Sequence, residues 1–185
     1  LGIYSVNPDA KVYVKVTNSW YDPKGEEEAA KTLLNMNCDV IAQHCDTVYP
    51  QTLAQEKGVY SIGYNSDMSK EAPEACLCSV IWNWSAYYTS AVQSVIDGTW
   101  DGSNYYGGMN ENLVSITPIA DFAADTTQEK VNVAKQQILS GKNGVFDGVI
   151  ETNTGATVGT AGKTLEDSVI TGGINWYFKT VSVIE

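Results

Sequence analysis

Short apolar runs alternate with helical stretches over roughly the first hundred residues. The apolar runs, rich in β-branched residues, predict strands at 12–17, 39–43, 59–64 and 75–83, and the run at 12–17 is expected to be a buried strand. Amphipathic periodicity and end signals predict helices at 24–37, 48–57 and 85–96. Strands that alternate with helices of this length are typical of βαβ units, so the sequence predicts an α/β fold with a parallel sheet flanked by helices.

Local signals mark several ends of these elements. Asp22 stands before Pro23, where it is suited to cap a helix, and acidic residues follow at 26–28, where the helix dipole favours them. Gly58 is suited to end the second helix. The chain opens with what reads as the last turn of a helix and has no initial Met, so we expect a mature fragment of a longer protein.

The character of the sequence changes after about residue 98. Residues 100–112 are rich in Gly, Asn and Tyr, which is typical of a surface loop. We expect a strand at 113–119, an amphipathic helix at 126–139, and a tail of short strands and turns over 143–185. A boundary near 116–120 divides the chain into a segment of residues 1–116 and a segment of residues 117–185.

Composition and charge exclude several classes of function. The 185 residues are 43% hydrophobic and 18% charged, a globular composition, and no apolar run reaches the roughly 18 residues of a membrane span. The net charge of −11 repels phosphate backbones, so no nucleic-acid partner is expected. The four cysteines lack the spacing of a zinc site or a small disulfide scaffold and are read as buried or half-buried thiols; they are Cys38, Cys45, Cys76 and Cys78.

No catalytic machinery is recognisable either. His44 is the only histidine, and the chain has no nucleophile elbow, no Gly-rich phosphate cradle and no metal-ligand cluster. The sequence therefore predicts no catalytic residue, no metal and no cofactor.

Aromatic, amide and carboxylate side chains instead gather in the four loops that follow the predicted strands. In parallel sheets these loops meet at the carboxyl edge, where ligands bind. The candidates are Asn18, Trp20, Asp22, His44, Asp46, Asn65, Asp67, Trp82, Asn83 and Trp84. Rings stack on a planar polar ligand while carboxylates and amides bond its edges, so the pattern favours a nucleotide-like or sugar-like binding lobe.

The same residues also have purely structural interpretations. Trp20 then covers a helix start or the sheet edge, Asp46 caps the helix near residue 47, and Asp67 caps the turn at 68–69. Trp82 and Trp84 share one face if the strand continues through both, and they are then core residues.

Motifs in a fixed order resemble a known family. They are VNPDAKV (6–12), NSWYDP (18–23), DVIAQHCD (39–46), EKGVYSIGYNSDM (56–68), VIWNWSAYY (80–88) and DGTW (97–100). This succession resembles the basic membrane protein family, which comprises substrate-binding lipoproteins of ABC importers that bind purine nucleosides or purine bases. The resemblance extends over essentially the whole chain.

The resemblance implies a type I periplasmic-binding-protein fold, in which two α/β lobes hold the ligand in a cleft. Residues 1–116 then correspond to the second lobe without its first strand, and residues 117–185 to the segment that returns to the first lobe and ends the protein. Most of the first lobe is absent from this sequence, so the missing N-terminal lobe is an expected partner. The family also implies an extracytoplasmic location, with an N-terminal lipid anchor that lies outside this chain.

Family roles transfer to matching residues. Trp20 stands where an aromatic ring stacks on the purine, and Asp67 stands where a carboxylate bonds the ligand. Trp82 lies near the position of a lysine that reaches the ribose in nucleoside binders. Because tryptophan has no ammonium group, we hypothesise that a free base such as adenine fits better than a nucleoside. Asn18 and Asp46 complete the predicted ligand site.

The expected function is capture of a purine base or nucleoside, without chemistry, by the solute-binding component of an ABC importer that docks on a membrane permease. One alternative is a nucleoside binder in which another group replaces the lysine. Others are a nucleoside-sensing receptor of the same fold and a purine-handling α/β enzyme such as a nucleosidase. The missing phosphate cradle, metal cluster and catalytic pair weigh against the enzyme.

Overall fold

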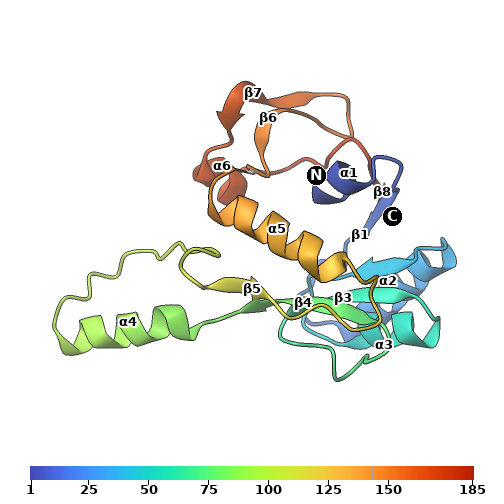
Figure 1. Ribbon diagram of the computed structural model, residues 1–185, viewed down its shortest axis with the longest axis horizontal. Coiled ribbons are helices and arrows are strands. Elements are labelled where there is room, and N and C mark those ends of the chain that lie inside the picture. The colour runs from blue at the N-terminus through green and yellow to red at the C-terminus, as the bar shows by residue number, and fades with distance from the viewer. Residues whose placement is uncertain (143) are drawn as a thin grey trace. The chain divides into compact units, whose positions relative to one another are not determined.

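The computed structural model describes residues 1–142 and 144–185, and Asn143, the first residue of the predicted tail, lies outside them. The chain divides into two compact units, one of residues 1–16 and 132–185, the other of residues 17–131. The elements are α1 (Gly2–Val6), β1 (Val12–Lys15), α2 (Pro23–Asn35), β2 (Val40–Ala42), α3 (Tyr49–Glu56), β3 (Tyr60–Asn65), β4 (Cys76–Trp82), α4 (Ser85–Ile96), β5 (Val114–Ile116), α5 (Thr127–Leu139), β6 (Asp147–Glu151), β7 (Thr157–Thr164), α6 (Asp167–Gly172) and β8 (Val181–Ile184) (Figure 1).

The larger unit is built on a four-stranded sheet with the order β2-β3-β4-β5. β2, β3 and β4 run parallel, and β5 is antiparallel to β4. α2 and α3 pack against each other, and both contact β2 (Figure 1). The predicted α/β fold, with a parallel sheet and flanking helices, is confirmed, and the antiparallel direction of β5 is a feature that the sequence pattern did not specify.

The core of this unit lies where α2, β2 and α3 meet. Its buried members are Ala30, Leu34, Ile41, Leu53 and Ala54. A second buried cluster is formed by residues of the loop between β3 and β4 and by the first residue of β4; its members are Met68, Ala72, Ala75 and Cys76. The first cluster packs β2 against α2 and α3, and the second joins the loop after β3 to the start of β4.

α2 begins where its end signal predicts. Asp22 is the N-cap residue, and its Oδ1 accepts a hydrogen bond from the backbone N–H of Gly25 at 3.0 Å. Pro23 occupies the first helical turn, where its fixed φ suits the helix and its missing N–H costs no intrahelical bond. The capping interpretation of Asp22 is therefore confirmed.

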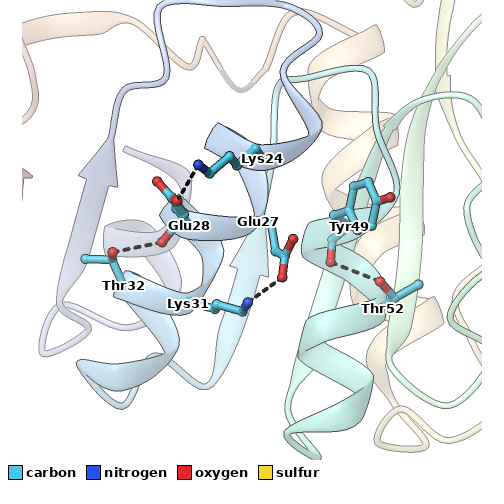
Figure 2. Close-up of polar contacts among 7 residues, drawn as sticks. All are labelled: Lys24, Glu27, Glu28, Lys31, Thr32, Tyr49 and Thr52. Atoms are coloured by element: carbon cyan, nitrogen blue, oxygen red, sulfur yellow. Dashed lines mark hydrogen bonds and ion pairs between the residues drawn. The ribbon is translucent and has the colours of Figure 1, made fainter.

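The solvent-facing side of α2 carries polar contacts within the helix (Figure 2). Lys24 Nζ lies 4.0 Å from Glu28 Oε1, and Lys31 pairs with Glu27 in the same i, i+4 relation. The Thr32 hydroxyl donates to the carbonyl oxygen of Glu28 at 2.8 Å. Because solvent screens exposed ion pairs, these contacts contribute little to the stability of the fold.

The first predicted strand forms, but it is not buried. β1 pairs in parallel with β8, with Val12 opposite Val181, in a two-stranded sheet of the smaller unit. All four of its residues are half-buried, since the strand has a neighbour on one side only. The expected burial of residues 12–17 is therefore wrong, because the strand pairs with the far end of the chain instead of joining the larger sheet.

The remainder of the smaller unit follows the predicted tail of short strands. β6 and β7 form an antiparallel pair, and Tyr4 of α1 packs edge-on against Phe178 with ring centroids 5.2 Å apart. α6 is a helix that the prediction of strands and turns missed.

α4 confirms the helix expected after β4, although none of its residues is buried. It runs away from the end of β4 in Figure 1. Its apolar side lines an open hollow of about 260 Å³, formed by Ala91, Val92, Val95, Ile96 and Trp100. Within residues 1–142 and 144–185, no helix has the length and hydropathy needed to cross a bilayer.

Candidate functional site

The carboxyl ends of β2, β3 and β4 lie along one edge of the larger sheet, because these three strands run parallel. His44 follows β2, Tyr64 stands one residue before the end of β3, and Trp82 ends β4. The loop before α2 joins this edge, since the backbone N–H of Asp46 donates to the carbonyl oxygen of Trp20 at 2.9 Å. Loops expected to converge from sequence are thus directly bonded here.

Three aromatic side chains come into contact at this edge, and we call them the Trp20–His44–Tyr64 ring group. The His44 ring centroid lies 5.6 Å from that of Trp20 and 4.1 Å from that of Tyr64. Trp20 is 62% exposed, so most of its indole is open to solvent. An exposed indole offers an apolar face against which a flat ligand can stack.

A buried amide network supports the same edge from beneath. Gln51 of α3 is fully buried; its Nε2 donates to the Ile62 carbonyl oxygen at 3.1 Å and its Oε1 accepts from Gln43 Nε2 at 2.6 Å. Gln43 Nε2 also lies 2.7 Å from the Thr47 carbonyl oxygen and 3.1 Å from Met68 Sδ. The network ties the end of β2 to α3, to β3 and to the loop after β3, so these loops share one support.

Asp67 lies exposed in the loop after β3. Its Oδ1 accepts a hydrogen bond from the backbone N–H of Ser69 at 3.0 Å, which confirms the predicted capping of that turn. This bond, with a further contribution from the Ser69 side chain, holds the pKa of Asp67 below its ordinary range. An ionised carboxylate accepts hydrogen bonds and donates none, so near neutral pH Asp67 is suited to groups that carry N–H or O–H donors.

We expect Asp67 to remain ionised below the ordinary aspartate pKa of about 3.9. Because its folded-state pKa is lowered, its contribution to stability is fully present above that value and is lost as the pH falls through the folded-state pKa. The carboxyl ¹³C resonance followed by NMR should therefore titrate at a lower pH in the folded protein than in urea. Equal midpoints in the two states would contradict this expectation.

Asn18 and Asp46, two further predicted residues of this edge, are exposed. Asn18 has a φ of 54°, in the left-handed region that asparagine tolerates better than most residues. Asp46 is exposed, and α3 begins later, with Val48 as its N-cap residue and no side-chain cap. The interpretation of Asp46 as a helix cap is therefore wrong, and its carboxylate is not engaged at the start of α3.

Trp82 belongs to a different set of rings. Its indole stacks on Trp84 with centroids 5.5 Å apart and planes 21° from parallel, and Trp84 in turn stacks on Tyr88 at 5.9 Å. Trp84 is the N-cap residue of α4 and is exposed, so the interpretation of both tryptophans as core residues of one strand is wrong. The structure thus brings Trp20, His44 and Asp46 together and places Trp82 against Trp84.

Sequence reasoning did not single out Tyr64. Tyr64 follows the buried Gly63 in β3, so its side chain lies on the opposite face of the sheet. Its ring contacts the ring of His44, which follows the neighbouring strand. An aromatic residue next to the end of a strand that precedes a candidate loop is the signal that would have identified it.

The cysteines and acidic residues do not form a metal centre. Across residues 1–142 and 144–185 no group of three or more His, Cys, Asp or Glu side chains is placed to hold a metal ion. The four cysteines are free, with Cys76 buried and the others half-buried, as expected. Burial raises the pKa of the Cys38 and Cys78 thiols, which makes them poor nucleophiles near neutral pH.

Comparison with known proteins places this chain in a family. The profile of the Bmp family, described as ABC transporter substrate-binding protein PnrA-like, matches residues 1–145. A purine-binding protein of Brucella abortus (strain 2308) is 36% identical over 177 residues, which cover 96% of this chain and 50% of that protein. The chain therefore spans about half the length of this relative.

Solved structures share the fold at low identity. A solute-binding protein of an ABC transporter system from Conexibacter woesei superposes with a TM-score of 0.56 at 22% identity, covering 77% of this chain and 48% of that one. A transcriptional activator of the comK gene from Bacillus halodurans gives 0.61 at 19% identity, covering 68% and 45%. The fold is thus that of solute-binding proteins, and because the family profile matches most of the sequence, the chain belongs to the Bmp family of PnrA-like ABC transporter substrate-binding proteins.

Proposed function

We propose that the protein captures a purine, and a free base such as adenine in preference to a nucleoside, as the solute-binding component of an ABC importer. The observation that carries this proposal is the Trp20–His44–Tyr64 ring group at the carboxyl edge of the parallel strands. Ligands of open α/β sheets bind at this edge, and flat heterocycles bind by stacking on aromatic rings.

The polar groups of the neighbouring loops suit the edge of a purine base. Asp46 and Asp67 are exposed carboxylates that accept hydrogen bonds, and a purine base offers ring N–H and exocyclic amine donors. The net charge of −11 disfavours a ligand that carries phosphate groups, so a base or nucleoside suits this protein better than a nucleotide.

The preference for a base over a nucleoside rests on Trp82. The resemblance to nucleoside binders leads us to expect a lysine near this position, where its ammonium reaches the ribose. Trp82 offers no ammonium, and its indole is half-buried and stacked on Trp84. Trp82 therefore supports a site without a ribose partner at this position.

Membership of the family and the name of the Brucella relative support the biological setting. We infer an extracytoplasmic protein, held to the membrane by a lipid anchor, whose first and second lobes close on the ligand and which delivers it to the membrane permease. Capture of this kind breaks and makes no covalent bond, so no catalytic residue is assigned.

Calorimetric titration of the full-length protein with adenine and with adenosine tests the proposal. We expect saturable adenine binding and an affinity for adenosine lower by about tenfold or more, equivalent to at least about 1.4 kcal/mol. Tighter binding of adenosine would overturn the preference for a base, and binding of neither would overturn the proposed function. Release of free adenine from adenosine on incubation would favour a nucleosidase instead.

A further inference from the structure

We propose that Glu26 is a positioning residue for this site: its buried carboxylate holds together the two loops that carry Trp20 and His44, without touching the ligand. This role depends on the proposed function for its ligand, although its structural part is measurable without one. Glu26 lies in the first turn of α2 and is 1% exposed, and it is the only buried residue with a charged side chain in the described part of the chain.

The Glu26 carboxylate bonds both loops at once. Its Oε1 accepts from the backbone N–H of Asp22 at 3.0 Å, at the end of the loop that carries Trp20. Its Oε2 accepts from the hydroxyl of Thr47 at 2.5 Å and from the backbone N–H of Thr47 at 3.3 Å, in the loop that carries His44. Each carboxylate oxygen thus serves a different loop.

These hydrogen bonds compensate the cost of burying a charge. A carboxylate removed from water is strongly destabilised unless hydrogen bonds or a cation replace its hydration. No ion pair to Glu26 is present among the described residues, so the donors of Asp22 and Thr47 and the dipole of α2 serve this purpose. The next two residues of the same helix pair with lysines, and of these Glu27 is half-buried and Glu28 is exposed (Figure 2).

The hydrogen bonds of Glu26 fix how the Trp20 and His44 rings lie relative to each other. Trp20 precedes Asp22 by two residues and His44 precedes Thr47 by three, so both rings are attached to backbone close to the bonded atoms. Among the described residues the two loops are also joined by the Asp46 N–H bond to the Trp20 carbonyl oxygen and by weaker contacts of the Cys45 thiol with Thr17 and Ser19. The Glu26 bonds are the ones made to a buried carboxylate, so we expect their loss to loosen the loops and shift the Trp20 indole relative to the His44 imidazole.

The Glu26→Gln substitution tests this role, with Glu28→Gln as a matched control on the exposed side of the same helix. Once assigned in the full-length protein, the ring-proton resonances of His44 report, through their chemical shifts, the ring currents of Trp20 and Tyr64. In the full-length protein we expect Glu26→Gln to move these resonances toward their unfolded-chain values and to weaken adenine binding about tenfold, as expected for loss of a charge-assisted hydrogen bond. Glu28→Gln should change neither.

A second pair of variants keeps the test decisive if Glu26→Gln fails to fold. Thr47→Val removes the hydroxyl donor at nearly constant shape, whereas Thr47→Ser retains it. We expect Thr47→Val to shift the His44 resonances in the same direction as Glu26→Gln does and to weaken adenine binding. Thr47→Ser should keep the wild-type resonances and the wild-type affinity.

The outcomes separate this role from a merely structural one and from the proposed function. If Glu26→Gln lowers only the melting temperature and the folded protein keeps the wild-type His44 resonances and adenine affinity, the positioning role is wrong. If Thr47→Ser behaves like Thr47→Val, the hydroxyl bond is not responsible and the role is also wrong. If the wild-type protein binds neither adenine nor adenosine, the proposed function fails, and the chemical shifts of the His44 ring protons alone decide whether Glu26 holds the Trp20 and His44 rings together.

Discussion

Replacement of Trp20 with alanine is expected to weaken adenine binding by about 5- to 150-fold, the range that corresponds to about 1–3 kcal/mol for stacking of one base on one aromatic ring. The stability of the fold should change little, because the indole is 62% exposed and packs against the His44 ring at the surface. Calorimetry gives the affinity, and thermal unfolding without ligand gives the stability.

Tyr21→Ala is the matched control for this prediction. Tyr21 is the next residue of the same loop, is 68% exposed, and lies outside the ring group. Its removal should leave adenine affinity close to that of the wild type. If Trp20→Ala binds adenine as tightly as the wild-type protein does, the stacking role of Trp20 is wrong.

Ile41→Ala is expected to lower the free energy of unfolding of the larger unit by about 2–5 kcal/mol. Ile41 is 3% exposed and packs in the cluster formed by α2, β2 and α3, so truncation removes buried apolar surface and leaves a cavity. Native-state hydrogen exchange of the α3 and β3 amides measures the effect within this unit, independently of the smaller one.

Val40→Ala provides the comparison for Ile41. Val40 is the preceding residue of β2, points to the opposite face of the strand and is 41% exposed. Its truncation should change the free energy of unfolding by no more than about 0.5 kcal/mol, as for most surface substitutions. Equal effects of the two substitutions would contradict the placement of the core on one face of β2.

Local signals in the sequence located the elements of the larger unit well. The apolar run at 39–43 and the capping residue Asp22 fixed a strand and a helix start to within a residue or two, since these signals act over a few positions. The partner of β1 could not be predicted in the same way. Its pairing with β8 joins segments more than 160 residues apart, and a strand's own residues do not specify its neighbour.

The candidate site could be predicted only in part, because some of its contacts also join segments that are far apart in the sequence. His44 and Asp46 follow a strand of the parallel sheet, as the pattern predicts. Trp20 meets them although the strand before its loop, β1, belongs to a different sheet. The contact between His44 and Tyr64 depends on where side chains point at the ends of two strands, which the element pattern leaves open. The buried position of Glu26 was also hidden, because a glutamate in a first helical turn is ordinarily read as a solvent-facing partner of the helix dipole.

The central claim is that a flat purine stacks on the indole of Trp20. Intermolecular nuclear Overhauser effects in the full-length protein saturated with adenine test it most directly. We predict cross-peaks from the adenine H2 and H8 protons to the Trp20 indole protons. Cross-peaks to Val92 and Ile96 in the apolar hollow of α4 without any to Trp20, or none to the protein at all, would contradict the claim.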